Sequence, residues 1–171
     1  MDSKLLCPYR VYKGKSFLTF TTKHKLKYKC FFFLYNNYSI AELEVKSKVY
    51  SFSFVCENQE NKSIKFDPCI GLTIGKILNE FFIKNPDAII QYICENSDLK
   101  AFKRQKSFAQ WTQKHNEDAE KVLIQAEIQD VIYLGVLLLK LHPERKKIKS
   151  FLQKNVTQYQ STQKTATLNE Y

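Results

Sequence analysis

One segment of the chain carries cationic, acidic and aromatic side chains at a spacing that could hold an anion. Residues 92–111 read YICENSDLKAFKRQKSFAQW. A helix turns by about 100° per residue, so a helix over residues 98–115 places Arg104 on the same apolar stripe as Phe108 and Trp111. The other charged side chains of this helix lie at the edges of the stripe or on the opposite side: Asp98, Lys100, Lys103, Lys106 and Lys114.

A guanidinium on an apolar stripe needs a partner, because an unpaired buried charge is costly. In one interpretation Arg104 bonds to a carboxylate such as Asp98, and Trp111 packs on its plane. In the other, Arg104 and Lys100 hold a phosphate or carboxylate in a pocket at the end of a preceding strand. The sequence favours the first interpretation, in which Arg104 only packs and pairs within the fold, but it leaves both interpretations open. The anion-binding set of the second interpretation is Asp98, Lys100, Arg104 and Trp111.

A second candidate lies on an extended segment near the N-terminus. Alternation places one set of side chains on a single face: Lys25, Lys27, Lys29, Phe31, Phe33 and Tyr35. Interleaved cations and aromatic rings are typical of surfaces that bind single-stranded nucleic acid. The alternative is a solvated sheet rim whose lysines block edge pairing and whose aromatic end is covered by a helix. Both faces turn aromatic after residue 30, so we expect burial on both sides there, which favours the alternative.

A third candidate is the basic segment HPERKKIKSFLQK at residues 142–154. Pro143 is predicted to open a helix, with Ile148, Phe151 and Leu152 as its buried stripe. Lys146 and Lys147 are then peripheral basic contacts for phosphates, or they only solvate the outer face of the helix.

The charge balance favours a polyanionic partner. The chain holds 27 basic and 17 acidic residues, a net charge of +10, and no acid lies between Asp2 and Glu42. Such a field attracts nucleic acid or an acidic protein.

The sequence shows few motifs that indicate catalysis or metal binding. The three histidines lack ligand spacing, and neither a phosphate-binding Gly-rich loop nor a Gly-x-Ser-x-Gly elbow occurs. We therefore predict no catalytic residue, no metal and no cofactor. The five cysteines show no Cys-x-x-Cys pair, which indicates free, mostly buried thiols in a reducing compartment. No signal peptide is evident, and the longest apolar run, Val131–Leu139, is too short to span a bilayer, so we expect a cytoplasmic protein.

The periodicity predicts an α+β fold. An N-terminal antiparallel β-meander uses residues 16–22, 25–35 and 49–56, joined by polar connections at 36–48 and 57–66. Asp67-Pro68 starts a helix that Asn85-Pro86-Asp87 ends. A central strand over 88–94, the helix up to His115, a β-hairpin over 120–141 and the C-terminal helix follow. A continuous helix over 120–141 is the rival interpretation. We expect a single layer of sheet packed by helices, in one domain over residues 1–154 with a polar, flexible tail over 155–171.

The motif Tyr92-Ile93-Cys94, followed by Asp98, Lys100, Arg104, Phe108 and Trp111, resembles a family of small bacterial proteins whose domain has no known function. The resemblance extends over about residues 9–154 and includes His142-Pro143, where relatives carry Asn-Pro. It implies a shared fold, and it implies that Asp98, Lys100 and Arg104 belong to a family pattern. At His142 an Asn would be the better helix cap.

The sequence thus favours a non-enzymatic binding module for nucleic acid or another polyanion. Arg104 and Lys100 are the predicted central contacts, and the peripheral ones are Lys25, Lys27, Lys29, Lys146 and Lys147. Two alternatives remain. One is a metal-independent ribonuclease-type toxin or phage-defence effector, and the other is a protein-interaction subunit with an acidic partner.

Overall fold

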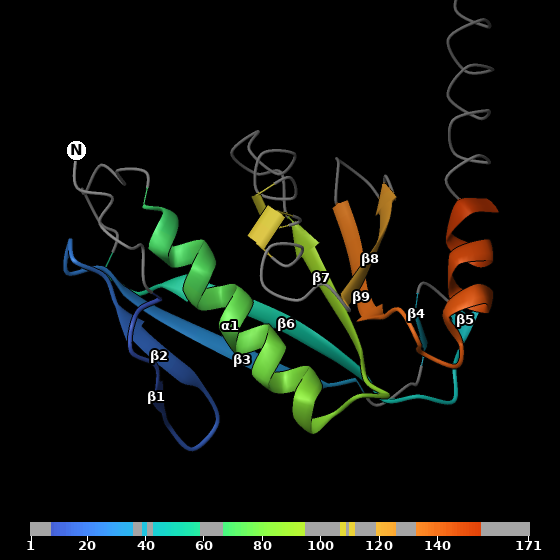
Figure 1. Cartoon of the computed structure of the whole chain (residues 1–171), viewed down its shortest axis with the longest axis horizontal. Helices are drawn as coiled ribbons and strands as arrows, with labels where there is room; N and C mark the ends of the chain where they lie inside the picture. Colours follow the sequence, from blue (N-terminus) through green and yellow to red (C-terminus); the bar gives the residue numbers. More distant parts are fainter. Residues whose placement is uncertain are drawn as a thin grey trace, which may run out of the picture.

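The fold is built on one mixed sheet of seven strands in the order β1-β2-β3-β6-β7-β9-β8 (Figure 1). The structure, a computed structural model, describes residues 8–35, 39–40, 43–58, 67–94, 107–108, 110–111, 119–125 and 133–154. The sheet strands are β1 (Tyr12–Lys13), β2 (Leu18–Thr21), β3 (Lys27–Leu34), β6 (Val49–Cys56), β7 (Ile89–Cys94), β8 (Ala119–Gln125) and β9 (Tyr133–Leu139). A two-stranded sheet of β4 (Ser39–Ile40) and β5 (Leu43–Glu44) stands apart from it. The predicted α+β class with a single layer of sheet is confirmed.

The N-terminal half of the sheet is the predicted antiparallel meander. β2 pairs with β3, and β3 pairs with β6 from Tyr28 opposite Cys56 to Leu34 opposite Tyr50. The segment predicted as a polar connection over 36–48 carries the β4–β5 hairpin. β1 is only two residues long and pairs with β2 at the edge of the sheet.

Helix α1 (Pro68–Lys84) begins and ends at the predicted signals. The Asp67 carboxylate accepts a hydrogen bond of 3.0 Å from the Cys69 N–H, and Pro68 occupies the first turn, where a missing N–H costs nothing. The helix ends at Asn85, whose N–H bonds to the carbonyls of the last turn. The chain then enters β7 parallel to β6, with Val49 opposite Ile89. A parallel pair needs a crossover, and α1 supplies it.

One face of the sheet packs on α1. The core on this side joins helix residues such as Ile74 and Leu78 to Phe52, Ile90 and Leu137 of the strands. Aromatic pairs reinforce it: the rings of Phe32 and Phe81 lie stacked at 4.2 Å, those of Tyr92 and Phe108 are also 4.2 Å apart, and those of Phe52 and Phe108 lie 5.7 Å apart. Offset aromatic packing of this kind contributes beyond the area it buries.

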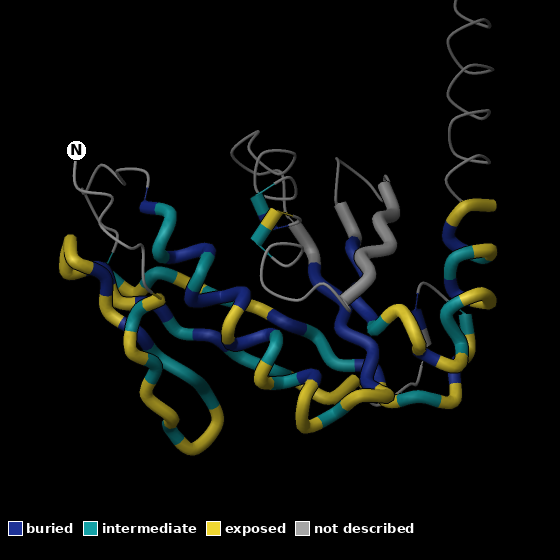
Figure 2. Tube along the Cα trace, in the orientation of Figure 1, coloured by how far each residue is buried: buried dark blue, intermediate teal, exposed yellow. Residues whose placement is uncertain are grey.

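A second core lies on the opposite face and covers only the other end of the sheet. Side chains alternate along a strand, so Ile89, Val136 and Leu138 point away from α1. They pack instead on the β4–β5 hairpin and on the helical residues 145–154, through Ile148 and Leu152. Buried residues therefore concentrate under α1 and where β7 crosses this second core (Figure 2).

The segment over 120–141 is a hairpin, and the rival interpretation as a continuous helix is wrong. β8 and β9 pair antiparallel from Ala119 opposite Leu139 to Gln125 opposite Tyr133. β9 also pairs with β7, and Gly135 lies opposite Tyr92. A Cβ at Gly135 would overlap the Tyr92 ring, so the glycine makes room for the aromatic side chain. Of the predicted helix ending at His115, residues 107, 108, 110 and 111 are described and helical.

His142 links the start of the C-terminal helix to the loop before β7. Its ring Nδ1 accepts a hydrogen bond of 3.1 Å from the Glu144 N–H, the bond that an Asn side chain would make two residues on. Its Nε2 lies 3.2 Å from the Asp87 carbonyl oxygen. The Nε2–H tautomer satisfies both contacts, so the histidine performs the turn function of Asn and adds a tether. The helix itself begins at residue 145, two residues after Pro143.

We predict that replacing His142 lowers stability in two steps. His142→Asn keeps the turn bond and loses the Asp87 tether, whereas His142→Ala loses both. We expect losses of about 1 and about 2 kcal/mol, respectively, in the free energy of unfolding, measured by urea denaturation. Equal stability of the two variants would contradict this assignment.

Glu144 ties the same helix to the loop after β5. Its carboxylate accepts hydrogen bonds of 2.9 and 3.0 Å from the Lys46 N–H and of 2.9 Å from the Ser47 N–H. Burial alone would raise the pKa of this carboxyl, but the hydrogen bonds from Lys46 and Ser47 and the nearby Lys147 outweigh it and hold the pKa below its usual value.

We predict an acid-dependent stability difference between the wild type and Glu144→Gln. Because the folded-state pKa lies below the unfolded one, the carboxylate stabilises the fold above the unfolded pKa of about 4.3. This contribution disappears as pH falls through the folded-state pKa. We expect the wild type to be more stable by about 1 kcal/mol at pH near 7, since the carboxylate is partly exposed. Urea denaturation across pH checks it, and a difference that persists unchanged in acid would refute it.

Candidate functional site

Of the predicted anion-binding set, only Trp111 lies among the described residues. Its ring is 6.3 Å from that of Phe54, and a Cβ on Gly71 of α1 would overlap the indole. Trp111 therefore packs against α1 beside the main core. Asp98, Lys100 and Arg104 lie outside the described residues, so their pairing as an anion pocket stays a prediction.

The predicted lysine track splits at the start of β3. Lys27 and Lys29 lie on the strand, whereas Lys25 precedes it in the turn with a φ of 59°. The Thr22 hydroxyl oxygen accepts the Leu26 N–H at 3.1 Å, and the Thr22 carbonyl accepts the Lys25 N–H at 2.9 Å. Lys25 thus serves the turn between β2 and β3 and is not part of the strand face.

The expectation that both faces of β3 are buried after residue 30 is wrong, and even on the α1 side Phe32 is half-buried and Leu34 is 47 % exposed. Tyr28 and Cys30 point toward α1 and are buried. On the other face Lys27 is exposed, Phe31 is half-buried and Phe33 is 54 % exposed. The reason is the placement of the second covering layer. The helical residues 145–154 stand over β7 and β9 and not over β3.

Strand register extends this uncovered surface across the meander. Residues directly opposite each other share a face, so Thr19 and Val55 flank Lys29, Ser53 flanks Phe31, and Ser51 flanks Phe33. Tyr12, 55 % exposed, lies opposite Thr19 on β1. We name this surface the open face and define it by Tyr12, Phe17, Thr19, Lys27, Lys29, Phe31, Phe33, Ser51, Ser53 and Val55. Short serine side chains beside two phenylalanines leave the flanks of the rings uncovered.

The rings of the open face form a contiguous row. Phe31 and Phe33 stack at 5.7 Å with 11° between their planes, and Phe17 meets Phe31 at 6.2 Å nearly edge-on. The Lys29 ammonium lies 4.8 Å from the centre of the Phe17 ring and forms an ion pair with Glu57. The arrangement offers π surfaces beside cations, which suits planar rings that carry negative charge.

The basic residues of the C-terminal helix lie elsewhere. Lys146 and Lys147 are exposed, and the Lys147 ammonium donates a hydrogen bond of 2.6 Å to the Glu44 carbonyl. This helix and the β1–β2 hairpin occupy opposite ends of the molecule (Figure 1). The predicted peripheral contacts therefore do not converge on one surface.

Sequence reasoning found the strand of the open face but missed its neighbours. The signal was present: Ser51 and Ser53 alternate with Phe52 and Phe54, the pattern of a strand with one polar face. Phe17 and Tyr12 required the register of β1 and β2, which the sequence does not give.

Two further features are absent from the described residues. None of their helices has the length and apolar character that crossing a bilayer requires. Within the same residues, no three His, Cys, Asp or Glu side chains gather as metal ligands would. Among the described cysteines, the Cys30 side chain is buried, and those of Cys56 and Cys69 are half-buried.

Comparison with known proteins places the chain in a family. No curated protein and no solved structure matches it. Residues 66–154, just over half of the chain, match the family described as "Family of unknown function (DUF6169)". The match begins directly before α1 and continues to the end of the described C-terminal helix, while the meander precedes it. The resemblance expected from residues 92–111 is confirmed in kind: the chain belongs to DUF6169, a family of unknown function.

Proposed function

We propose that the protein is a binding module for single-stranded nucleic acid and that the open face is its contact surface. The observation that carries the proposal is the Phe31–Phe33 stack, half-buried at Phe31 and 54 % exposed at Phe33, beside lysines on a sheet face that no second layer of described residues covers. Every base has a π face, so a row of exposed rings binds single strands with little sequence preference. The net charge of +10 supplies the long-range attraction to phosphate.

The position of β3 argues against the alternative of a protective sheet rim. Lysines block unwanted pairing where a strand forms an edge. β3 is hydrogen-bonded on both sides, to β2 and to β6. Lys27 and Lys29 therefore cannot serve edge protection, and exposed rings beside them remain to be explained. A binding surface explains both the lysines and the rings beside them.

We predict that the double substitution Phe31→Ala/Phe33→Ala weakens binding of a fluorescent oligonucleotide of about 10 nucleotides. Stacking contributes about 1–3 kcal/mol per base, so at least a tenfold loss of affinity is expected. Fluorescence anisotropy at low salt measures it, and thermal unfolding verifies that the variant folds. The matched control is Ile83→Ala, which removes an apolar side chain that is 72 % exposed on α1.

The salt dependence of oligonucleotide binding extends this test. Binding should fall steeply with salt concentration, and Lys27→Ala should lower the slope by about one. The proposal fails if no oligonucleotide binds at low salt, or if the phenylalanine variant and the control bind equally. Capture of one specific acidic protein by the open face, unaffected by nuclease, would favour the protein-interaction alternative instead.

We also predict that Glu57→Gln tightens oligonucleotide binding. Glu57 pairs with Lys29, so it neutralises a cation of the open face and repels phosphate. We expect an increase in affinity of roughly threefold at low salt, lost at high salt. Glu80→Gln is the control, because Glu80 pairs with Lys76 on α1 at 3.9 Å, on the other side of the sheet from the open face. A tighter complex with both variants, or with neither, would remove Glu57 from the site.

The toxin alternative depends on Arg104, which lies outside the described residues. It predicts growth arrest on expression that Arg104→Ala abolishes without loss of folding. The proposed binding of nucleic acid by the open face does not require toxin activity.

A further inference from the structure

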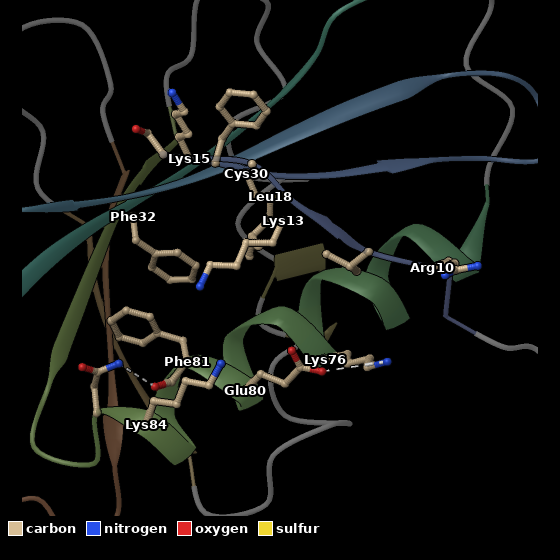
Figure 3. A pocket seen from close by; sticks show the side chains of 15 residues that line it. Arg10, Lys13, Lys15, Leu18, Cys30, Phe32, Lys76, Glu80, Phe81 and Lys84 are labelled. Atoms are coloured by element: carbon tan, nitrogen blue, oxygen red, sulfur yellow. Dashed lines mark hydrogen bonds and ion pairs between the residues drawn. The ribbon is translucent and has the colours of Figure 1, made fainter.

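A pocket opens on the side of the meander that faces away from the open face, between the β1–β2 hairpin and the C-terminal half of α1 (Figure 3). Its volume is about 530 Å³, within the range of small-molecule sites. It lies on the α1 side of the sheet, because Leu18 and Cys30 of its lining pair across β2 and β3 and Cys30 faces the main core. The open face lies on the other side of the same strands.

The floor of the pocket is apolar. Leu18 and Cys30 line it together with Phe32 and Phe81, whose rings stack with 5° between their planes. Figure 3 shows these two rings facing one another across the strand–helix junction. A ligand body seated on this floor meets hydrocarbon and ring surface, which favours an apolar body over a heavily hydroxylated one.

The rim of the pocket is cationic. Five of its lining residues are basic, Arg10, Lys13, Lys15, Lys76 and Lys84, and one is acidic, Glu80. Glu80 is paired with Lys76. In Figure 3 the ammonium groups of Lys13 and Lys84 point toward the space beside Phe32 and Phe81 from the strand and from the helix. Among the described residues, neither of these two lysines is ion-paired with a carboxylate.

The position of Lys84 has a partial explanation in the helix itself. It lies in the last turn of α1, where a cation interacts favourably with the helix dipole. That explanation does not extend to Lys13, which comes from β1 and converges on the same space. Two cations from separate elements above an aromatic floor match a ligand that carries negative charge at one end.

We propose that this pocket binds a small organic carboxylate with an apolar body, held between the Lys13 and Lys84 ammonium groups and resting on the Phe32–Phe81 stack. The site lies on the other side of the sheet from the open face, with Phe17 bordering both, and does not depend on the proposed binding of nucleic acid. Binding is reversible and non-covalent. The Cys30 thiol in the floor is fully buried, and burial raises its pKa to about 12, so it stays protonated.

The test is isothermal titration calorimetry of the full chain with naphthoate and decanoate, an aromatic and an acyl carboxylate. Naphthamide serves as the uncharged probe and inorganic phosphate as the anion without a body. We expect at least one carboxylate to bind at least tenfold more tightly than both naphthamide and phosphate, because charge-assisted contacts and apolar burial both contribute. Which carboxylate binds more tightly tells an aromatic ligand from an acyl one.

Variants assign the binding to the pocket. Lys13→Met/Lys84→Met should lower carboxylate affinity roughly tenfold, while Lys23→Met, an exposed lysine in the β2–β3 turn, should leave it unchanged. All three side chains are exposed, so folding is expected to survive, and thermal unfolding checks it. Phe31→Ala/Phe33→Ala should retain carboxylate binding, which separates this site from the open face. The proposal is overturned if neither carboxylate binds at millimolar concentration, if naphthamide binds as tightly, or if the double lysine variant binds like the control.

Discussion

The packing of α1 against one face of the sheet is the interaction on which the rest of the structure depends. Because α1 connects β6 to β7, it makes those two strands parallel and so joins the meander to the C-terminal hairpin. Its apolar side buries Ile74, Ile77 and Leu78 against strand residues from both halves of the sheet. A substitution that displaced the helix would therefore remove the core and the continuity of the sheet together.

The same interaction divides the molecule into two regions with different surfaces. Around β7 and β9 the sheet is covered on both sides, by α1 and by the helical residues 145–154. Around β2 and β3 the described residues cover it on one side only, which leaves aromatic rings at the surface. The family match covers α1 and the doubly covered region, while the singly covered meander lies before it. The proposed open face thus lies before the matched residues, whereas the proposed pocket also takes Phe81 and Lys84 from within them.

Local signals in the sequence were enough to predict the elements. Asp67-Pro68 and Asn85 bound α1 through backbone hydrogen bonds that depend only on neighbouring residues, and alternation marked β3 and β6. Which face of β3 would be covered depended on where α1 packs, and whether the other face would also be covered depended on where residues 145–154 dock. The alternation of side chains along β3 is the same for both faces, so it cannot show which face is covered. Lys27 and Lys29 were predicted as site residues, whereas Phe17, the flanking serines and the pocket required strand register and the approach of α1.

The dependence of the meander on α1 has a consequence during synthesis on the ribosome. Residues 12–56 emerge before residues 68–84, so the nascent meander carries Tyr28, Phe32 and Phe52 without the helix that buries them. Isolated sheets with an exposed apolar face are only marginally stable and associate readily. The basic charge of this stretch, free of acids up to Glu42, keeps such chains apart by mutual repulsion until the helix arrives. Like charge along the N-terminal strands is therefore expected to oppose association of growing chains.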